Sequence, residues 1–491
     1  MTATFGRLDL GYDVGAICSG ILHLGTGAFH RGHQAVYADD LLRSGETAWG
    51  ITGLNVLPPD LTGAHAAQKG SYAVLARDGQ GAEARAVSSL RAVHYRQDPN
   101  SGNGLDLLAD PAMALVTLTI TEKGYCHVPG TTRLDMNSAI AADVAKGGGA
   151  CTAIGYLVEA LRRRRAAGLP GLTVASCDNI PANGRLLRGV VLDYARRIDT
   201  GLADWIKDSV TFPCSMVDRI VPAMNDEARA LLAEAAGCFD ALGVVTEPFR
   251  QWVIEDAFTG PRPPLERVGV QVTDDVEAFE LMKHRILNGV QTALAHVGWL
   301  SGFRTSAEAS ADPVLSEYAL RFMQAQAKTL RCPPGEDLES YIAVSLQRLR
   351  NPTIHHPLEQ IGTDSSFKVR QRLSDSTADL LRTGEAVELH ALTLAAWMQY
   401  VGGVARDGSP VPVHDPLASV CAQIRATHAD RPQAQVEGFL ALDVFPEELR
   451  ENGAFRSLTA EILAALQKQT PRDLLAGLLA AESRMAGGVH G

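Results

Sequence analysis

The pattern of apolar and polar positions divides the chain into two parts. In the first part, short apolar runs predict buried strands at residues 16–24, 49–56, 114–121 and 172–176. After about residue 275, apolar residues recur every three or four positions and predict helices at residues 314–330, 338–349, 386–400 and 455–466. A chain of 491 residues is too long for one ordinary core. We therefore expect two domains, residues 1–276 and residues 277–491.

One helical stretch, residues 279–299, carries an unusual set of polar side chains. Its apolar residues recur at spacings of three and four, so we expect an amphipathic helix. On a regular helix Asn288 lies about 140° from Lys283, and Gln291 lies between them, about 80° from Lys283. A partly buried lysine can act as a base, and amide NH2 groups can stabilise an oxygen that gains negative charge. The alternative is a surface lysine beside two amides that tie the helix to a neighbour.

The first predicted strand runs into a glycine-rich turn. Gly25 and Gly27 follow residues 16–24, and the segment FHRGHQAVYADDLLRSG then continues with a helical pattern. Strand, GxG turn and helix open a dinucleotide-binding fold, in which the glycines let the backbone approach a pyrophosphate. The third glycine of that motif is missing, because position 30 is His. Asp60, after the second strand, could bind the adenosine ribose; equally, it could simply belong to a turn after two prolines.

Other polar residues follow predicted strands or gather in one long segment. Glu122 follows residues 114–121, and Asn179 follows residues 172–176. In open parallel sheets this edge is where ligands bind. Two later segments mix charges with aromatic or apolar anchors, as binding loops often do, and they contain Asp218 and Arg250.

The segment 351–375 interrupts the helices of the second half with polar residues. They are His355, His356, Gln360, Asp364, Lys368, Arg370 and Arg372. Two interpretations stay open, an exposed loop with a helix start and a cationic wall that faces an anionic or polyhydroxyl ligand.

Composition excludes several classes of protein. Lys and Arg number 45 against 56 Asp and Glu, a net charge of −11 without a long basic run, so we expect no nucleic-acid partner. The run of arginines at 162–165 ends a helical pattern and predicts a solvated helix end. No apolar stretch approaches the roughly 18 residues of a membrane span, and residues 1–12 lack a signal-peptide core. Eight scattered cysteines without a CxxC pair fit a reducing cytoplasm. His30 and His33 have no carboxylate nearby in a metal-site pattern, so we expect no metal.

Taken in order, these motifs resemble the polyol-specific long-chain (mannitol) dehydrogenase family. The resemblance covers roughly residues 21–411 and rests on GTGAFHRGHQA, TEKGYC, SCDNIPANG, FPCSMVDRIVP, EPFRQWVIED, KHRILNG and NPTIHHPLEQIGTDSSFKVRQR. It implies an α/β chain, with an N-terminal Rossmann-type dinucleotide-binding domain followed by a mainly α-helical C-terminal domain and the active site between them. It also implies NAD(H) or NADP(H), a small-molecule substrate, no metal and a monomer.

The resemblance also implies roles for individual residues. Lys283 matches the general base, Asn179 and Asn288 match the pair that stabilises the alcoholate oxygen, and Glu122 matches an acid at the mouth of a proton path. Lys368 matches a substrate contact. The candidates for cofactor binding are Gly25, Gly27, Phe29, Arg31 and Asp60, and those for substrate binding are Gln291, His356, Gln360, Lys368, Arg250, Arg372 and Asp218.

One residue departs from the family pattern. Gln291 stands where the family usually has a histidine that orients the substrate, and glutamine cannot titrate near neutral pH. His356 could supply the missing imidazole. Gln291 is also the only feature that favours a non-catalytic sensor of nucleotides and sugar acids.

Within the family the motifs lean toward the fructuronate reductase branch, which acts on D-mannonate and D-fructuronate. Gln360 stands where mannitol enzymes tend to carry arginine. Arg250, Arg370 or Arg372 could bind the substrate carboxylate bidentately, or each could form an interdomain salt bridge. The alternative is a mannitol or D-arabinitol 2-dehydrogenase. We expect NAD rather than NADP, because the charge of Asp60 would repel a 2′-phosphate.

Overall fold

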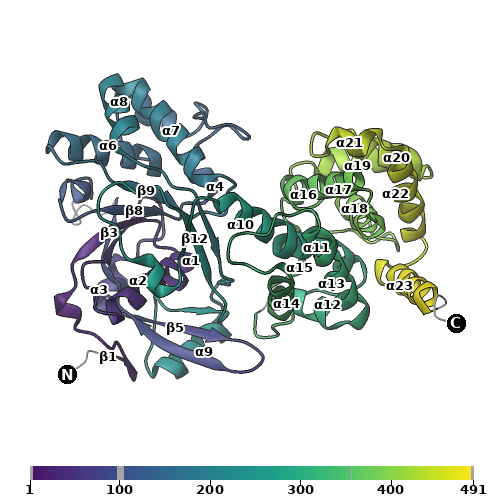
Figure 1. Ribbon diagram of the computed structural model, residues 1–491, viewed down its shortest axis with the longest axis horizontal. Helices are drawn as coiled ribbons and strands as arrows, with labels where there is room; N and C mark the ends of the chain where they lie inside the picture. The colour runs from purple at the N-terminus through teal and green to yellow at the C-terminus, as the bar shows by residue number, and fades with distance from the viewer. Residues whose placement is uncertain (1–3, 97–103, 355, 488–491) are drawn as a thin grey trace. The chain divides into compact units, whose positions relative to one another are not determined.

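The structure is a computed structural model that describes residues 4–96, 104–354 and 356–487, with side chains described up to residue 480. His355 therefore lies outside the described residues. The chain forms two compact units, Met1–Glu277 and Ala278–Gly491 (Figure 1).

The core of the first unit is a five-stranded parallel sheet. Its strands lie in the order β7-β4-β3-β8-β9, so that β3 lies between β4 and β8. This order is that of a dinucleotide-binding sheet, in which the second and third strands lie on one side of the first strand and the later strands lie on its other side. The bounds are β3 Ser19–Leu24, β4 Gly50–Asn55, β7 Leu90–Tyr95, β8 Leu115–Leu118 and β9 Thr173–Ser176. The predicted α/β class is confirmed, although the strands are shorter than the apolar runs that predicted them.

Helices cover both faces of this sheet. On one face lie α6, α7 and α8 (Figure 1), and an apolar cluster that includes Tyr156 and Tyr194 is buried there; on the other face α2 packs with Trp49 and Trp252. Helices on both faces leave no side of a parallel sheet in water, so its strands are apolar runs. The helices are α1 Ala28–Gly32, α2 Gln34–Arg43, α3 Thr62–Ala67, α4 Thr121–Gly124, α5 Ile140–Ala145, α6 Ala153–Ala166, α7 Asn183–Ile198, α8 Thr200–Ser209 and α9 Asp226–Ala236; short 3-10 turns are η1 Val14–Ala16, η2 Leu107–Ala109 and η3 Leu265–Val268.

Smaller sheets complete the first unit. One has the order β11-β5-β6 and another the order β10-β12-β13. In the second of these, Asp218 pairs with Gln251 across antiparallel strands, which brings the two predicted binding segments side by side. The bounds are β1 Thr4–Phe5, β2 Leu8–Asp9, β5 Tyr72–Arg77, β6 Ala82–Val87, β10 Ser215–Asp218, β11 Val244–Thr246, β12 Gln251–Glu255 and β13 Gln271–Thr273.

The arginines at the end of α6 do not all lie in solvent. Arg164 is buried and donates to the carbonyl oxygens of Pro170, at 2.6 Å, and Leu108, at 3.0 Å. The guanidinium therefore satisfies backbone acceptors in the 3-10 turn η2 and in the segment before β9. The prediction of a solvated helix end holds for Arg162 and Arg163, which pair with Glu159, and is wrong for Arg164.

The second unit is built from helices, as predicted. Its centre is formed by α11 and α18, which are buried along nearly their whole length. The bounds are α10 Val276–Met282, η4 Lys283–Leu287, α11 Asn288–Leu300, α12 Ser306–Ala311, α13 Pro313–Ala327, α14 Leu338–Leu349, α15 Leu358–Gly362, α16 Ser365–Val369, η5 Arg370–Ser374, α17 Asp375–Thr383, α18 Glu388–Val401, α19 Ala418–Thr427, α20 Pro432–Leu440, α21 Glu447–Glu451, α22 Gly453–Leu466 and α23 Pro471–Gly487.

The stretch predicted as one amphipathic helix, residues 279–299, differs in two ways. It is interrupted by the π-helical turn η4, and α11 is not amphipathic, because every residue from Asn288 to Gly298 is buried. Helices α12, α13, α15 and α18 pack around α11, so no face of it meets solvent. A second π-helical turn, η5, packs against η4 and α11. In the described part of the chain, no helix is both long and apolar enough to cross a membrane.

Both units bury neutral histidines. Burial lowers the pKa of His23 and His33 in the first unit, and of His296 and His390 in the second, to about 3. Burial also lowers the pKa of His30 well below its usual value. These side chains stay neutral in the folded chain at a pH at which the unfolded chain protonates them.

We expect the stability of both units to fall as the pH drops from about 6.5 toward 4, because the unfolded state binds protons that the folded state cannot. Each such histidine contributes up to about 1.4 kcal/mol per pH unit in this range. Thermal unfolding midpoints between these pH values measure the effect. His390→Phe, which removes an imidazole stacked on Phe322, should flatten the dependence, whereas the same change at exposed His414 should not. A midpoint of the parent protein that does not change over this range would contradict the prediction.

Candidate active site

The glycine-rich turn lies at the C-terminal end of β3, and its backbone demands glycine. Gly25 has φ of +93°, and a Cβ atom there would lie 2.1 Å from the carbonyl oxygen of Thr119. Its N–H donates to the Leu54 oxygen at 2.9 Å, and its own oxygen accepts from Thr119 Oγ1 at 2.7 Å. Gly27 precedes α1, and a Cβ atom there would meet no atom closer than 4.0 Å. The turn is thus fixed at Gly25 and open at Gly27, where a ligand could approach the backbone.

A pair of histidines replaces the third glycine of the motif. His30 stacks on His23, with ring centroids 3.4 Å apart and the planes inclined by 18°. His23 in turn bonds Thr117 Oγ1 at 2.7 Å and the Gly25 oxygen at 3.1 Å. The usual third glycine allows close packing of helix on strand. Here two flat rings fill that interface, which explains how this fold tolerates His30.

Arg31 and Phe29 support the turn from within the first unit. Arg31 is buried and donates to the oxygens of Thr26 and Leu242, each at 2.6 Å. Phe29 is half-buried and stacks on His33, with centroids 5.0 Å apart. The two guanidinium contacts shape the turn, so the predicted role of Arg31 in cofactor binding would be exerted mainly through the Thr26 backbone.

Asn55, which the sequence motifs did not single out, joins this turn to the loop that carries Asp60. Its Oδ1 accepts from Thr26 N at 2.8 Å and Thr26 Oγ1 at 2.9 Å, and its Nδ2 donates to the Pro59 oxygen at 2.8 Å. Asp60 is exposed and accepts from Thr62 N and Oγ1, bonds that lower the pKa of the Asp60 carboxyl. Asp60 therefore starts the α3 turn, and its exposed carboxylate remains available to a ligand.

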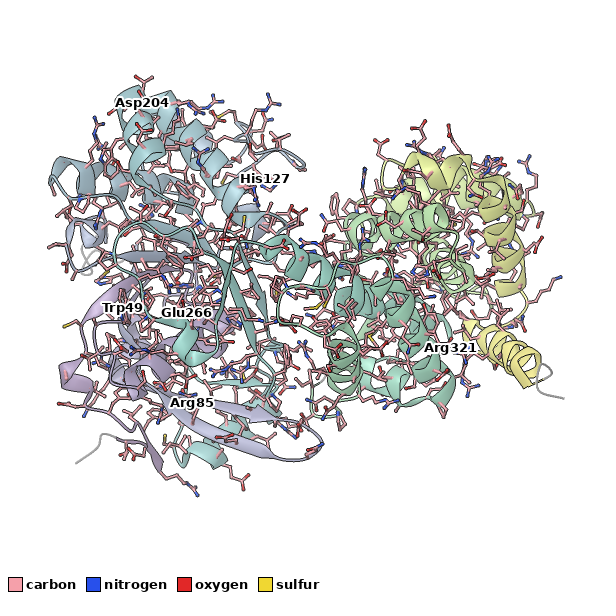
Figure 2. The ribbon with its side chains drawn as sticks, in the orientation of Figure 1. Trp49, Arg85, His127, Asp204, Glu266 and Arg321 are labelled. Carbon is pink, nitrogen blue, oxygen red and sulfur yellow. The ribbon has the colours of Figure 1, made fainter. Side chains whose placement is uncertain are left out.

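The ends of β8 and β9 meet at one edge, as the parallel pattern predicted. The Asp178 carboxylate accepts from Ile120 N at 3.0 Å, Thr121 N at 2.9 Å and Tyr125 Oη at 2.7 Å. Glu122 and Asn179 follow these strands and are exposed. His127, labelled in Figure 2, lies with its Nε2 3.9 Å from Glu122 Oε1. This edge therefore carries an exposed acid, Glu122, and an exposed amide, Asn179, on backbone that the hydrogen bonds of Asp178 hold in place.

The other candidates of the first unit are held by their neighbours. Asp218 is buried at the end of β10. Arg250 pairs with Asp40 at 2.5 Å and lies over the ring of Tyr37, 4.4 Å from its centroid. Arg85, labelled in Figure 2, also pairs with Asp40. The charge of Arg250 is thus neutralised inside its own unit, which makes it a weaker candidate for a substrate carboxylate than an arginine without an acidic partner.

In the second unit, η4 gathers three candidate residues on one buried helix. The N–H of Asn288 bonds the oxygen of Lys283 five residues before it. Because a π-turn closes on the fifth residue instead of the fourth, it takes more residues per turn, and the two side chains lie closer to one face than the about 140° of a regular helix. Lys283, Asn288 and Gln291 are 5, 7 and 9% exposed. Among the described residues, Asn288 Nδ2 has no hydrogen-bond acceptor.

The second π-turn brings Arg372 to the same helix. Gly289 allows the close approach, because a Cβ atom there would lie 3.2 Å from the oxygen of Arg372. The Arg372 Nη1 donates to Thr292 Oγ1 at 3.0 Å. Burial lowers the pKa of Arg372 to about 10. No carboxylate of the described segments lies within ion-pairing distance of this guanidinium.

Lys368 lies near Arg372 but is tied to the main chain. Its Nζ donates to the oxygens of Ile361, at 3.0 Å, and Thr363 at the end of α15. Burial, and then the charge of Arg372, lower the pKa of Lys368 to about 8. Lys368 and Arg372 together therefore form a cationic patch beside η4 and α11.

The remaining candidates of the long polar segment lie apart from this patch. Gln360 is exposed on α15, whose Leu358 packs against α11 at Gly298, near the far end of that helix. His356 is half-buried, and its oxygen accepts from Ser306 N. Within the described residues, no cluster of three or more His, Cys, Asp or Glu side chains could hold a metal ion.

Comparison with known proteins gives the family. The mannitol dehydrogenase Rossmann domain matches residues 19–267, and the mannitol dehydrogenase C-terminal domain matches residues 275–468. The D-mannonate oxidoreductase of Escherichia coli (strain K12) is 39% identical over 476 residues, which cover 95% of this chain and 97% of that protein.

Two further relatives are named for mannitol. A mannitol 2-dehydrogenase of Pyrenophora tritici-repentis is 36% identical over 460 residues, which cover 92% of this chain and 80% of that protein. The solved structure of Pseudomonas fluorescens mannitol 2-dehydrogenase, a ternary complex with NAD and D-mannitol, is 34% identical, with a TM-score of 0.83 and 98% of each chain covered. This chain therefore belongs to the mannitol dehydrogenase family of oxidoreductases.

Proposed function

We propose that this protein is an NAD-dependent oxidoreductase that interconverts D-mannonate and D-fructuronate, a secondary alcohol and a ketone on an acyclic sugar acid. The observation that carries the proposal is the polar set on η4 and α11. Lys283 and Asn288 are buried on a helix with apolar surroundings, and Asn288 Nδ2 has no acceptor among the described residues. Such a donor is suited to an oxygen that gains negative charge during a reaction.

The reaction needs a base for the hydroxyl proton and an acceptor for the hydride. NAD, when bound, accepts the hydride. Lys283 takes the hydroxyl proton in oxidation and returns it in reduction. Asn288, with Asn179 of the first unit, donates to the reacting oxygen, and loss of one such donor typically costs on the order of a hundredfold in rate. Glu122, which is exposed on α4 after β8, exchanges the proton with solvent.

The choice of a sugar acid rests on charge. The relatives include a D-mannonate oxidoreductase at 39% identity and a mannitol 2-dehydrogenase at 36%, so identity alone favours neither substrate class. Arg372 is a partly buried cation without a carboxylate partner among the described residues, and Lys368 adds a second charge beside it. The carboxylates of Asp364 and Asp415 act on Lys368, so the charge without a counterpart is that of Arg372. A substrate carboxylate would neutralise it, whereas mannitol or D-arabinitol would leave it unpaired.

The cofactor follows from the turn at Gly25 and from Asp60. The open backbone at Gly27 suits a pyrophosphate, and the Pseudomonas fluorescens relative binds NAD. The exposed charge of Asp60 would bind ribose hydroxyls and repel the 2′-phosphate of NADP. We further propose that the protein works as a monomer in the cytoplasm, where its eight free cysteines would stay reduced.

We expect the purified protein to oxidise D-mannonate with NAD and to reduce D-fructuronate with NADH, both followed by NADH absorbance. Lys283→Met should lower kcat by about 10²–10⁴-fold, because the base is lost. Lys328→Met, at an exposed lysine paired with Glu385, is the matched control and should leave kcat unchanged.

Two outcomes would contradict the proposed function. Turnover of D-fructose or D-mannitol with no turnover of sugar acids would favour a polyol 2-dehydrogenase. Binding of NADH with no turnover across sugar acids and polyols would favour a sensor.

We expect Asn55→Ala to weaken NADH binding by about tenfold, roughly the effect of one or two lost hydrogen bonds. The change frees the turn at Thr26 from the loop that carries Asp60. Titration of NADH fluorescence gives the Kd without reliance on turnover. Asn225→Ala, which removes the N-terminal cap of α9, is the control for a lost asparagine and should leave the Kd unchanged. Equal Kd values for Asn55→Ala and the parent would refute the role of Asn55.

Gln291→His should change the pH dependence of the reaction. Glutamine does not titrate, so the new histidine should add a limb to the profile of kcat/KM, at a pH below its usual pKa of about 6.5 because burial disfavours the charged imidazole. Profiles of both proteins with D-mannonate and D-mannitol measure this, and the ratio of the two substrates shows whether position 291 selects between them. A variant whose pH profile and substrate ratio match the parent would show that position 291 does not contact the reacting groups.

A further inference from the structure

Hydrogen bonds hold both the main-chain oxygen and the guanidinium of Arg372. At the main chain, Gln326 Nε2 donates to the Arg372 oxygen at 2.8 Å, and Gly289 leaves room for that oxygen beside α11. At the side chain, Nη1 donates to Thr292 Oγ1 at 3.0 Å. A long flexible side chain that is fixed at both ends is presented in one orientation, which is the condition for bidentate recognition of a planar anion.

The hydroxyl of Thr292 can accept a hydrogen bond from Arg372, because its own proton is donated elsewhere. Its side chain is fully buried, and its hydroxyl donates to the Asn288 oxygen at 2.9 Å, four residues earlier on α11. The single hydroxyl proton is therefore used, and a lone pair remains to accept from a guanidinium. The contact ties the orientation of Arg372 to the helical turn that carries Asn288.

Among the described residues, no carboxylate forms an ion pair with Arg372. The described carboxylates nearest in sequence are engaged elsewhere, since Asp375 faces Arg370 at 3.8 Å and Asp379 pairs with Arg285 at 2.6 Å. Lys368, beside Arg372, is itself cationic, and the carboxylates of Asp364 and Asp415 act on Lys368. A desolvated charge without a partner is costly unless a ligand supplies the opposite charge.

We propose that Thr292 is a positioning residue that sets preference for a carboxylate-bearing substrate, by aiming the remaining N–H groups of Arg372 at that carboxylate. This rests on the proposed function, because it assigns the carboxylate of the sugar acid to Arg372. Thr292 itself does not touch the substrate; it acts through Arg372.

The test compares kinetics and binding of D-mannonate for Thr292→Val, Thr292→Ser and Arg372→Met. Valine keeps the shape of threonine and removes the acceptor, whereas serine retains it. We expect Thr292→Val to raise the KM for D-mannonate by about tenfold with kcat within about threefold of the parent, and Thr292→Ser to behave as the parent.

A matched control separates this role from a structural one. Thr459→Val removes a buried hydroxyl that likewise bonds an oxygen four residues earlier, that of Phe455, but has no arginine partner. It should leave the KM unchanged. Adding Thr292→Val to Arg372→Met should have no further effect on the KM, because the two side chains act as one unit.

The outcomes distinguish this inference from the proposed function. If the parent oxidises D-mannonate and Thr292→Val keeps its KM, or if the two substitutions add independently, the inference is overturned and the function stands. If the parent oxidises no sugar acid, the proposed function fails, and calorimetry with D-mannonate then decides. Binding that Thr292→Val weakens and Thr292→Ser preserves would support the anion site, and no binding by the parent would overturn it. If Thr292→Val unfolds, Thr292→Ala, which also removes the acceptor, takes its place. An affinity for D-mannonate about tenfold weaker than that of the parent would support the inference, and an affinity equal to that of the parent would overturn it.

Discussion

The second unit depends on how one fully buried helix accommodates polar side chains. Burial of α11 on every face leaves no solvent for Lys283, Asn288 and Gln291, and polar groups removed from water destabilise a fold unless they are bonded. A protein retains such groups where they serve a purpose other than stability. The π-turn η4 adds to this, since it replaces regular helical bonds at the lysine itself. Strained or irregular helical turns are frequent at functional sites, and this one changes which face the lysine shares with the amide.

In the first unit, buried polar side chains hold the shape of the turn at Gly25. The turn at Gly25 must hold a backbone shape that only glycine adopts, and it must do so without the third glycine of the usual motif. Stacked His23 and His30 fill the gap between helix and strand, and Asn55 and Arg31 bond the turn at Thr26 from two sides. Neutral imidazoles suit this position because they can stack and can accept hydrogen bonds in an interior without water. Burial also opposes their protonation, so the turn should lose stability at low pH, where the unfolded chain protonates these histidines.

Much of the fold could be predicted from the sequence, because it depends on periodicity. Short apolar runs become buried strands when helices cover both faces of a parallel sheet, and apolar spacings of three and four become packed helices. The π-turn η4 could not be predicted, because the helix after it is buried on every face and has no polar stripe against which one extra residue in a turn would show. Arg164 looked like part of a solvated run, since two of the backbone oxygens that it bonds, those of Leu108 and Met113, lie 56 and 51 residues away in the sequence.

The residues of the candidate site likewise fall into those that the sequence indicates and those that only the structure indicates. The family motifs indicate Lys283 and Asn288 as candidates, and the parallel pattern placed Glu122 and Asn179 at one edge of the sheet. The sequence did not indicate Asn55 and Thr292, which became candidates only through the contacts that the structure shows. Each makes its contact with a partner far along the chain, Thr26 and Arg372 respectively, and a small polar residue within a strand or helix gives no signal of such a contact.

Charge neutralisation then separates arginines that are equivalent in sequence. Arg250, Arg370 and Arg372 each stand in a segment rich in polar residues, and each could face a carboxylate. In the structure Arg250 is neutralised by Asp40, and Arg370 is exposed near Asp375, where solvent screens its charge. Arg372 alone of the three is partly buried without a described acid, on the turn that packs against the helix of Lys283 and Asn288. A cation in that position gains most from an anionic ligand, because desolvation strengthens the attraction that solvent would otherwise weaken.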